Sequence, residues 1–306
     1  MGYLSWLKET FYFEREDLFM LSMQHVMCTI LGTDDDDLYY IKNHASKVLF
    51  PDAIRAYSGP RQYSHFEMSA DGDDVSWWHL PDADDFKKLD KDFVQKHLQQ
   101  NGHLCENIRP CAIGENTDLS TFYQHNQHLS KDMQLAVTYH LKQDIVFDEF
   151  IREKINCNDK YDDVFRFRGE AYDGKGVRGL IGDIEQHGIY VLAHELYQTY
   201  GITANQQWFE DTIKPVLERD YPADLADKTF GFMKMDETVD ERITNHDWTH
   251  LDEGVFSYDE YCAMYQKVID RMYATDEEHL LERVRMAEAL CENIQQPSYD
   301  DCEFSF

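Results

Sequence analysis

Most of this chain carries apolar residues in the pattern of α-helices. Residues 15–31 form the first such stretch, with Leu18, Val26 and Ile30 among its apolar positions, and Gly32 follows as a stop signal. Further helices are predicted over residues 88–100, 130–154, 176–200 and 204–219. We find no convincing run of alternating polar and apolar residues, so the pattern predicts an all-α fold.

Acidic residues and helix breakers divide the first third of the chain. Asp34 to Asp37 indicate the start of a second helix, because carboxylates suit the positive N-terminal end of a helix. This helix is predicted to end near Phe50-Pro51. Residues 58–86 contain breakers such as Gly59-Pro60 and are predicted to be a loop-rich insertion. Charges and glycines indicate a short ordered excursion or hairpin at residues 157–175.

The length of the chain allows one large domain. A sequence of 306 residues that is 42% hydrophobic can bury a substantial core, and we expect a single α-helical domain over residues 1–296. Its last two helices, predicted over 257–273 and 275–294, would form an αα-hairpin. Residues 297–306 are acidic and are expected to form a flexible tail.

The charge balance restricts the choice of partners. The chain has 59 acidic and 29 basic residues, which gives a formal net charge of -30. Such a surface repels phosphate backbones at long range, so a protein that coats nucleic acid directly is not expected. Divalent cations, a basic protein partner, or simple solubility remain open as reasons for this charge.

Cysteine usage and hydropathy indicate a cytoplasmic protein. The seven cysteines include no CxxC pair, which argues against a secreted disulfide scaffold. The first 13 residues lack the apolar core of a signal peptide. No apolar run reaches the roughly 18 residues that a membrane span requires, so we expect no membrane span.

The strongest chemical pattern lies in the helix predicted over residues 130–154. His140, Asp144 and Asp148 recur every four residues and therefore share one face of that helix. One imidazole and two carboxylates in a stripe are typical ligands of a divalent cation. A face in contact with water would carry the same pattern, so both interpretations remain open.

Other candidate ligands come from two further regions. Asp52 follows a proline at a junction between helix and loop, where it could also be a turn or capping residue, and His65 follows 13 residues later. In the helix predicted over 176–200, Asp183 and His187 lie on one stripe, which faces either water or the interior. The sequence does not decide between these alternatives.

Several remaining histidines receive a structural interpretation. His25 shares a face with Cys28 in an apolar helix, where a lone histidine is more often a satisfied core residue than a ligand. His246 and His250 are four residues apart, but Gly254 makes a loop as plausible there as a helix. Two further sets are given no functional role: Trp77-Trp78-His79 looks like a packing cluster, and the pair His125 and His128 looks like surface histidines.

The order of Asp52, His65, His140 and Asp144 resembles the zinc-dependent phospholipase C and S1/P1 nuclease superfamily. That pattern has a loop aspartate, a histidine about a dozen residues later, and a helical HxxxD. The resemblance implies an all-α fold, zinc ions between helices, and phosphodiester hydrolysis by a metal-bound hydroxide. Two elements of the family are missing: Val191 occupies the acidic position of HxxxE after His187, and the N-terminal tryptophan ligand is absent.

The leading hypothesis is a metal-dependent hydrolase that acts on small phosphate esters or phosphodiesters. Zinc is the expected metal, with manganese or iron as alternatives. Asp148 or Asp183 would orient a ligand histidine or serve as the general base. The predicted metal ligands are Asp52, His65, His140, Asp144 and His187.

The alternative hypothesis is a non-catalytic acidic interaction protein. Such a protein would imitate nucleic acid and inhibit a basic nucleic-acid-binding enzyme, as an inhibitor encoded by a mobile element would. Its motivation is the net charge of -30. The fourteen histidines favour the hydrolase, because a charge mimic has no use for imidazoles on the inner faces of helices.

Overall fold

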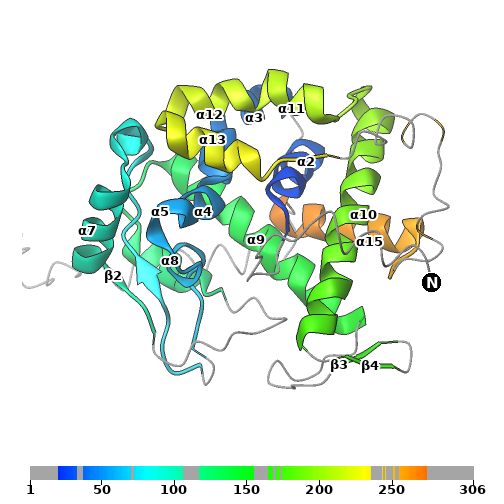
Figure 1. The fold of residues 1–306 in the computed structure, drawn as a ribbon, viewed down its shortest axis with the longest axis horizontal. Helices are drawn as coiled ribbons and strands as arrows, with labels where there is room; N and C mark the ends of the chain where they lie inside the picture. Colours follow the sequence, from blue (N-terminus) through cyan, green and yellow to red (C-terminus); the bar gives the residue numbers. More distant parts are fainter. Residues whose placement is uncertain are drawn as a thin grey trace, which may run out of the picture.

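The structure is a computed structural model, and helices make up most of the part of the chain that it describes (Figure 1). This confirms the predicted all-α fold. No helix in that part is long and apolar enough to cross a membrane. The described residues are 20–32, 37–69, 72–105, 117–154, 165–167, 170–172, 174–235, 243, 245, 251 and 255–273.

Helix α2 (Ser22–Gly32) lies at the centre of the helical packing. It contacts the other long helices, which are α3 (Asp37–Val48), α9 (Lys131–Lys154), α10 (Gly174–Tyr200) and α15 (Tyr258–Tyr273). Residues 22 to 30 of α2 are all buried, the polar Gln24, His25 and Thr29 included. Polar groups on such a helix need partners inside the protein, because burial removes them from water.

Shorter helices and two small two-stranded sheets complete the described structure. The sheets pair β1 (Trp77–Trp78) with β2 (Gly102–His103), and β3 (Phe165–Phe167) with β4 (Glu170–Tyr172), both antiparallel. The second sheet lies within the predicted excursion at 157–175. The shorter helices are α4 (Phe50–Ala53), α5 (Arg55–Ser58), α6 (Gln62–His65), the 3₁₀ helix η1 (Ala83–Lys88), α7 (Lys91–Asn101), α8 (Leu119–His125), α11 (Gln206–Thr212), α12 (Lys214–Asp220) and α13 (Ala223–Gly231).

The prediction of a single helix over 204–219 is wrong, because α11 and α12 are separate helices that meet at Ile213. Pro215 lies in the first turn of α12, where it has no N–H to give to the preceding helix and its ring crowds the carbonyl four residues earlier. The loop-rich region predicted at 58–86 contains the short helices α6 and η1. The helix predicted over 275–294 and the tail at 297–306 lie outside the described residues.

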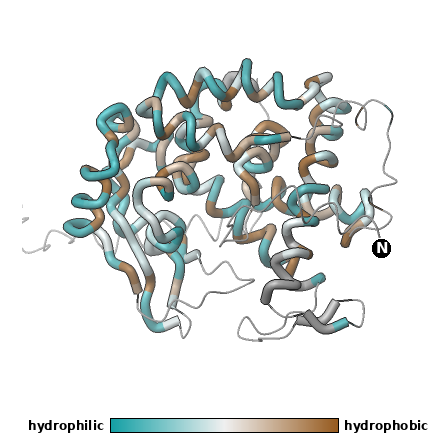
Figure 2. The backbone as a smooth tube through the Cα atoms, viewed as in Figure 1, coloured by the Kyte–Doolittle hydropathy of each residue, from teal (hydrophilic) through white to brown (hydrophobic). Residues whose placement is uncertain are grey.

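An aromatic cluster positions α4 within the core. Phe50 stacks on Phe86 of η1, with ring centroids 4.4 Å apart and 6° between the ring planes. Tyr221 packs against both rings, and the ring centroids of Trp78 and Phe50 are 6.4 Å apart. Figure 2 shows hydrophobic and hydrophilic segments alternating along the helices of the described structure. Because Phe50 and Pro51 are buried, the next residue, Asp52, is held at a fixed place.

Candidate metal centre

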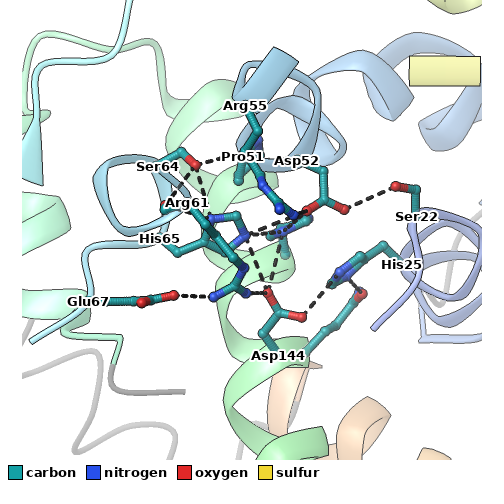
Figure 3. Close-up of polar contacts among 12 residues, drawn as sticks. Ser22, His25, Pro51, Asp52, Arg55, Arg61, Ser64, His65, Glu67 and Asp144 are labelled. Atoms are coloured by element: carbon teal, nitrogen blue, oxygen red, sulfur yellow. Dashed lines mark hydrogen bonds and ion pairs between the residues drawn. The ribbon is translucent and has the colours of Figure 1, made fainter. Parts of the chain in front are cut away.

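Five potential metal ligands from four helices meet between α2 and α9 (Figure 3). They are His25 on α2, Asp52 on α4, His65 on α6, and His140 and Asp144 on α9. They form two groups, His25/His140/Asp144 and Asp52/His65/His140, and within each group the ligand atoms lie within 4.8 Å of one another. His140 belongs to both groups.

Ligand atoms of Asp52, His65 and Asp144 lie close to the Nε2 atom of His140. The Nε2 atoms of His65 and His140 are 3.1 Å apart, and each lies 3.5 Å from Asp144 Oδ2. Asp52 Oδ1 lies 3.7 Å from His65 Nε2 and 3.9 Å from His140 Nε2. Ligands about 2.0–2.1 Å from a tetrahedral zinc ion are about 3.3 Å apart from one another. The observed separations are close to those between ligands that share one ion.

Local sequence explains why Asp52 and His65 lie together. The Ser64 hydroxyl donates to the carbonyl of Pro51 at 2.8 Å, which joins α6 to α4 beside both ligands. After His65 the chain turns at Phe66, whose φ of 54° is in the left-handed region. That conformation is costly for a bulky residue, and the burial of Phe66 against Phe122 holds it in place.

The tautomer of His65 suits metal binding. Its Nδ1 lies 3.3 Å from the carbonyl of Arg61 and 3.0 Å from the Ser64 hydroxyl, whose proton goes to Pro51. Nδ1 therefore carries the proton, and the Nε2 lone pair points at the centre, an assignment that follows from the hydrogen-bond network. Metal-bound histidines commonly donate their other ring nitrogen to a backbone carbonyl in this way.

Burial keeps His65 and His140 neutral. It lowers the pKa of both rings, and the pKa of His140 falls to about 4 because the repulsion from His25 adds to burial and outweighs the attraction of Asp52 and Asp144. The nearby Arg61 lowers the pKa of His65 further. A neutral imidazole is the form that binds a metal, so at neutral pH protons do not compete for these two rings.

The Nε2 atom of His25 faces the Asp144 carboxylate. The Thr29 hydroxyl donates to the carbonyl of His25 at 2.7 Å and accepts the Gln143 amide N–H at 3.0 Å. Gln143 therefore turns its oxygen to His25 Nδ1, 2.6 Å away, and Nδ1 must be the donor. The His25 Nε2 atom then faces Asp144 Oδ1 at 3.3 Å, and neither atom has a hydrogen-bond partner among the described residues. A proton or a cation is required between them.

The pKa values of His25 and Asp144 agree with a positive charge between His25 Nε2 and Asp144 Oδ1. Burial lowers the pKa of His25, but the Asp144 carboxylate more than offsets it, so the pKa is raised. For Asp144, burial raises the pKa, but His25 and Arg61 together bring it to about 2. Asp144 is therefore ionised throughout the physiological range and can serve as a charged ligand.

Arg61 is a buried cation at the edge of the centre. One of its guanidinium nitrogens donates to Asp144 Oδ2 at 2.8 Å, and another donates to Glu67. Its side chain is only 1% exposed. Nothing in the sequence around Gly59-Pro60-Arg61 indicated this role, because both carboxylates come from more distant positions.

Solvent reaches the centre from the side of Asp52. The side chains of His25, His65, His140 and Asp144 are fully buried, whereas Asp52 is 14% exposed. Arg55 is 31% exposed, with a guanidinium nitrogen 4.0 Å from Asp52 Oδ1. Ser22 on α2 donates to the other Asp52 oxygen at 3.0 Å. Asp52 and Arg55 thus form the rim through which a ligand would approach.

The structure brings together four of the predicted ligands and adds His25. Neither group of potential ligands among the described residues includes His187, Asp148 or Asp183. Asp148 is buried on α9, and Asp183 and His187 are half-buried on α10, where burial raises the pKa of Asp183. Their predicted roles as ligand or general base stay predictions. His246 and His250 lie outside the described residues.

Comparison with known proteins gives no relative. No family model matches the chain, and neither the curated proteins nor the solved structures contain a match. The resemblance to the zinc-dependent phospholipase C and S1/P1 nuclease superfamily therefore stays a prediction that rests on four positions.

Proposed function

We propose that this protein binds a divalent cation, zinc in the first instance, and uses it to hydrolyse phosphate esters or phosphodiesters. The observation that carries the proposal is that ligand atoms of Asp52, His65 and Asp144 lie within 3.9 Å of His140 Nε2. Two neutral imidazoles and two carboxylates suit zinc, and also manganese or iron. A bound ion of this kind supplies a hydroxide at neutral pH and polarises a phosphoryl oxygen.

The residues at the rim suit a phosphate group. Arg55 carries a permanent positive charge beside Asp52, the most exposed of the five potential ligands, and a guanidinium matches phosphate oxygens in pairs. Asp52, one turn earlier, links this rim to the metal ligands. A phosphate ester bound by Arg55 would thus lie next to the ion.

The excess negative charge alone does not separate the hydrolase from an acidic interaction protein. The buried cluster does favour the hydrolase. A protein that imitates nucleic acid needs carboxylates on its surface, whereas His25, His65, His140 and Asp144 have no exposed surface. Burying such groups without a bound partner is costly, so a role in binding explains them better.

We expect the purified full chain to contain zinc, manganese or iron in near-stoichiometric amount by elemental analysis. Removal of the metal with a chelator should lower the Tm by about 5 °C or more. A ligand present at 100 times its Kd stabilises the native state by about 2.7 kcal/mol, which supports a shift of that size. Adding the metal back should restore the Tm. A protein without metal, whose Tm ignores chelator and metal alike, contradicts the proposal.

Replacing Arg55 with Gln should reduce kcat/KM for a chromogenic phosphodiester such as bis(p-nitrophenyl) phosphate by about tenfold, because a hydrogen bond to a charged group contributes about 1.5–3 kcal/mol. Metal content should be unchanged. The control is Lys88→Gln, which removes an exposed cation in η1 that pairs with Asp85. Metal binding without any metal-dependent hydrolysis would show that the ion has a structural role instead.

A further inference from the structure

Arg61 carries a permanent positive charge. An arginine side chain stays protonated inside proteins, so its buried guanidinium is a fixed cation. It lies between two carboxylates, with Asp144 Oδ2 at 2.8 Å on one side and Glu67 on the other. Asp144 Oδ2 also lies 3.5 Å from the Nε2 atoms of His65 and His140. The same oxygen thus serves both Arg61 and the proposed cation position.

The two groups of potential ligands compete for the same side chains. His140 belongs to both groups, and Asp144 is the only carboxylate in the group that contains His25. A second divalent ion beside His25 would therefore share its one carboxylate with the first ion and with Arg61. Repulsion between these cations is strong in a buried site, where water does not screen it.

Positive charge already present in the cluster opposes a second divalent ion. Arg61 carries one positive charge between Asp144 and Glu67, and Arg55 lies 4.0 Å from Asp52. A second ion would add two further positive charges close to the Arg61 guanidinium, and uncompensated buried charge is strongly unfavourable.

We propose that the centre is mononuclear, and that Arg61 supplies the positive charge that a second ion would otherwise bring. Asp52, His65, His140 and Asp144 hold the ion, while Arg61 holds the Asp144 carboxylate through a hydrogen bond to the same Oδ2 atom. Arg61 is thus a positioning residue that also limits the number of ions. This inference rests on the proposed function of the same site.

The test is the zinc stoichiometry of the full chain, measured by isothermal titration calorimetry and by elemental analysis after dialysis. The wild type should bind one equivalent. His25→Ala should also bind one equivalent, because His25 is not a ligand of the single ion. Two equivalents in the wild type, of which His25→Ala loses one, would overturn the mononuclear centre and leave the hydrolase proposal intact. Zero equivalents would overturn both.

Variants of Arg61 test whether its charge limits the number of zinc ions that bind. Arg61→Gln removes the charge and should raise the zinc bound at saturation above one equivalent, whereas Arg61→Lys keeps the charge and should stay at one. The matched control is Arg219→Gln, since Arg219 pairs with Asp220 on α12, outside the cluster. If Arg61→Gln stays at one equivalent, the limiting role of Arg61 is wrong. If Arg61→Gln does not fold, a wild type that binds two equivalents would still overturn the proposal.

Discussion

Replacing Asp144 with Asn should weaken metal binding by more than about 100-fold and abolish metal-dependent hydrolysis. Changes to residues that only support a ligand typically reduce affinity 10- to 100-fold, and Asp144 is itself a proposed ligand. The substitution keeps the shape of the side chain and removes its charge. It therefore tests the charge of Asp144 and leaves the packing of α9 nearly unchanged.

The same substitution should also destabilise the metal-free protein, by about 3 kcal/mol. Without the carboxylate, Arg61 loses a charged partner and His25 Nε2 loses the charge that it faces. Urea unfolding in the presence of chelator measures this cost separately from the loss of metal.

The control for Asp144→Asn is Asp132→Asn, which changes an exposed aspartate in the first turn of the same helix. It should cost less than about 1 kcal/mol, through the helix dipole, and leave metal content unchanged. If Asp144→Asn retains a full equivalent of metal, Asp144 is not a ligand. If it loses metal without any loss of stability in chelator, the ion pair with Arg61 contributes nothing to folding.

Part of the centre could be predicted from local spacing. His140 and Asp144 are one turn apart on a helix, so any arrangement that buries that face brings them together. Asp52 follows Phe50-Pro51, and a helix start with buried apolar residues leaves the next carboxylate little freedom. For Asp183 and His187 the spacing was equally suggestive. Which face of α10 meets the centre depends on its packing against α2 and α15, which spacing does not encode.

The residues that sequence reasoning missed are those whose partners lie far along the chain. His25 depends on Gln143, 118 positions away, for its tautomer. Arg61 depends on Asp144, 83 positions away, for its charge partner. A weak signal existed for His25, because Ser22, Gln24 and Thr29 are further polar residues in a helix that is mostly apolar. Four polar residues on a buried helix indicate an internal network more strongly than a single histidine does.

Gly188→Ala should be among the most destabilising single substitutions in the long helices, at about 3 kcal/mol. A Cβ atom at this position would lie 1.9 Å from the Tyr265 hydroxyl and 2.9 Å from Gln24 Nε2. Those two groups are buried and bond each other at 2.5 Å where α2, α10 and α15 meet. The added methyl group must push these helices apart or break that hydrogen bond, and each costs about 1–3 kcal/mol.

Gly182, on the same helix, provides a control that distinguishes the effect of this clash from the effect of helix propensity. Alanine favours a helix by about 1 kcal/mol over glycine, so Gly182→Ala, whose Cβ would meet nothing within 4 Å, should leave stability unchanged or raise it. Urea unfolding of the two variants beside the wild type gives both effects. A Gly188→Ala variant as stable as Gly182→Ala would mean that Tyr265 and Gln24 move aside easily. Helix α2, which carries His25 next to Gln24, would then be held less firmly than the proposed metal centre requires.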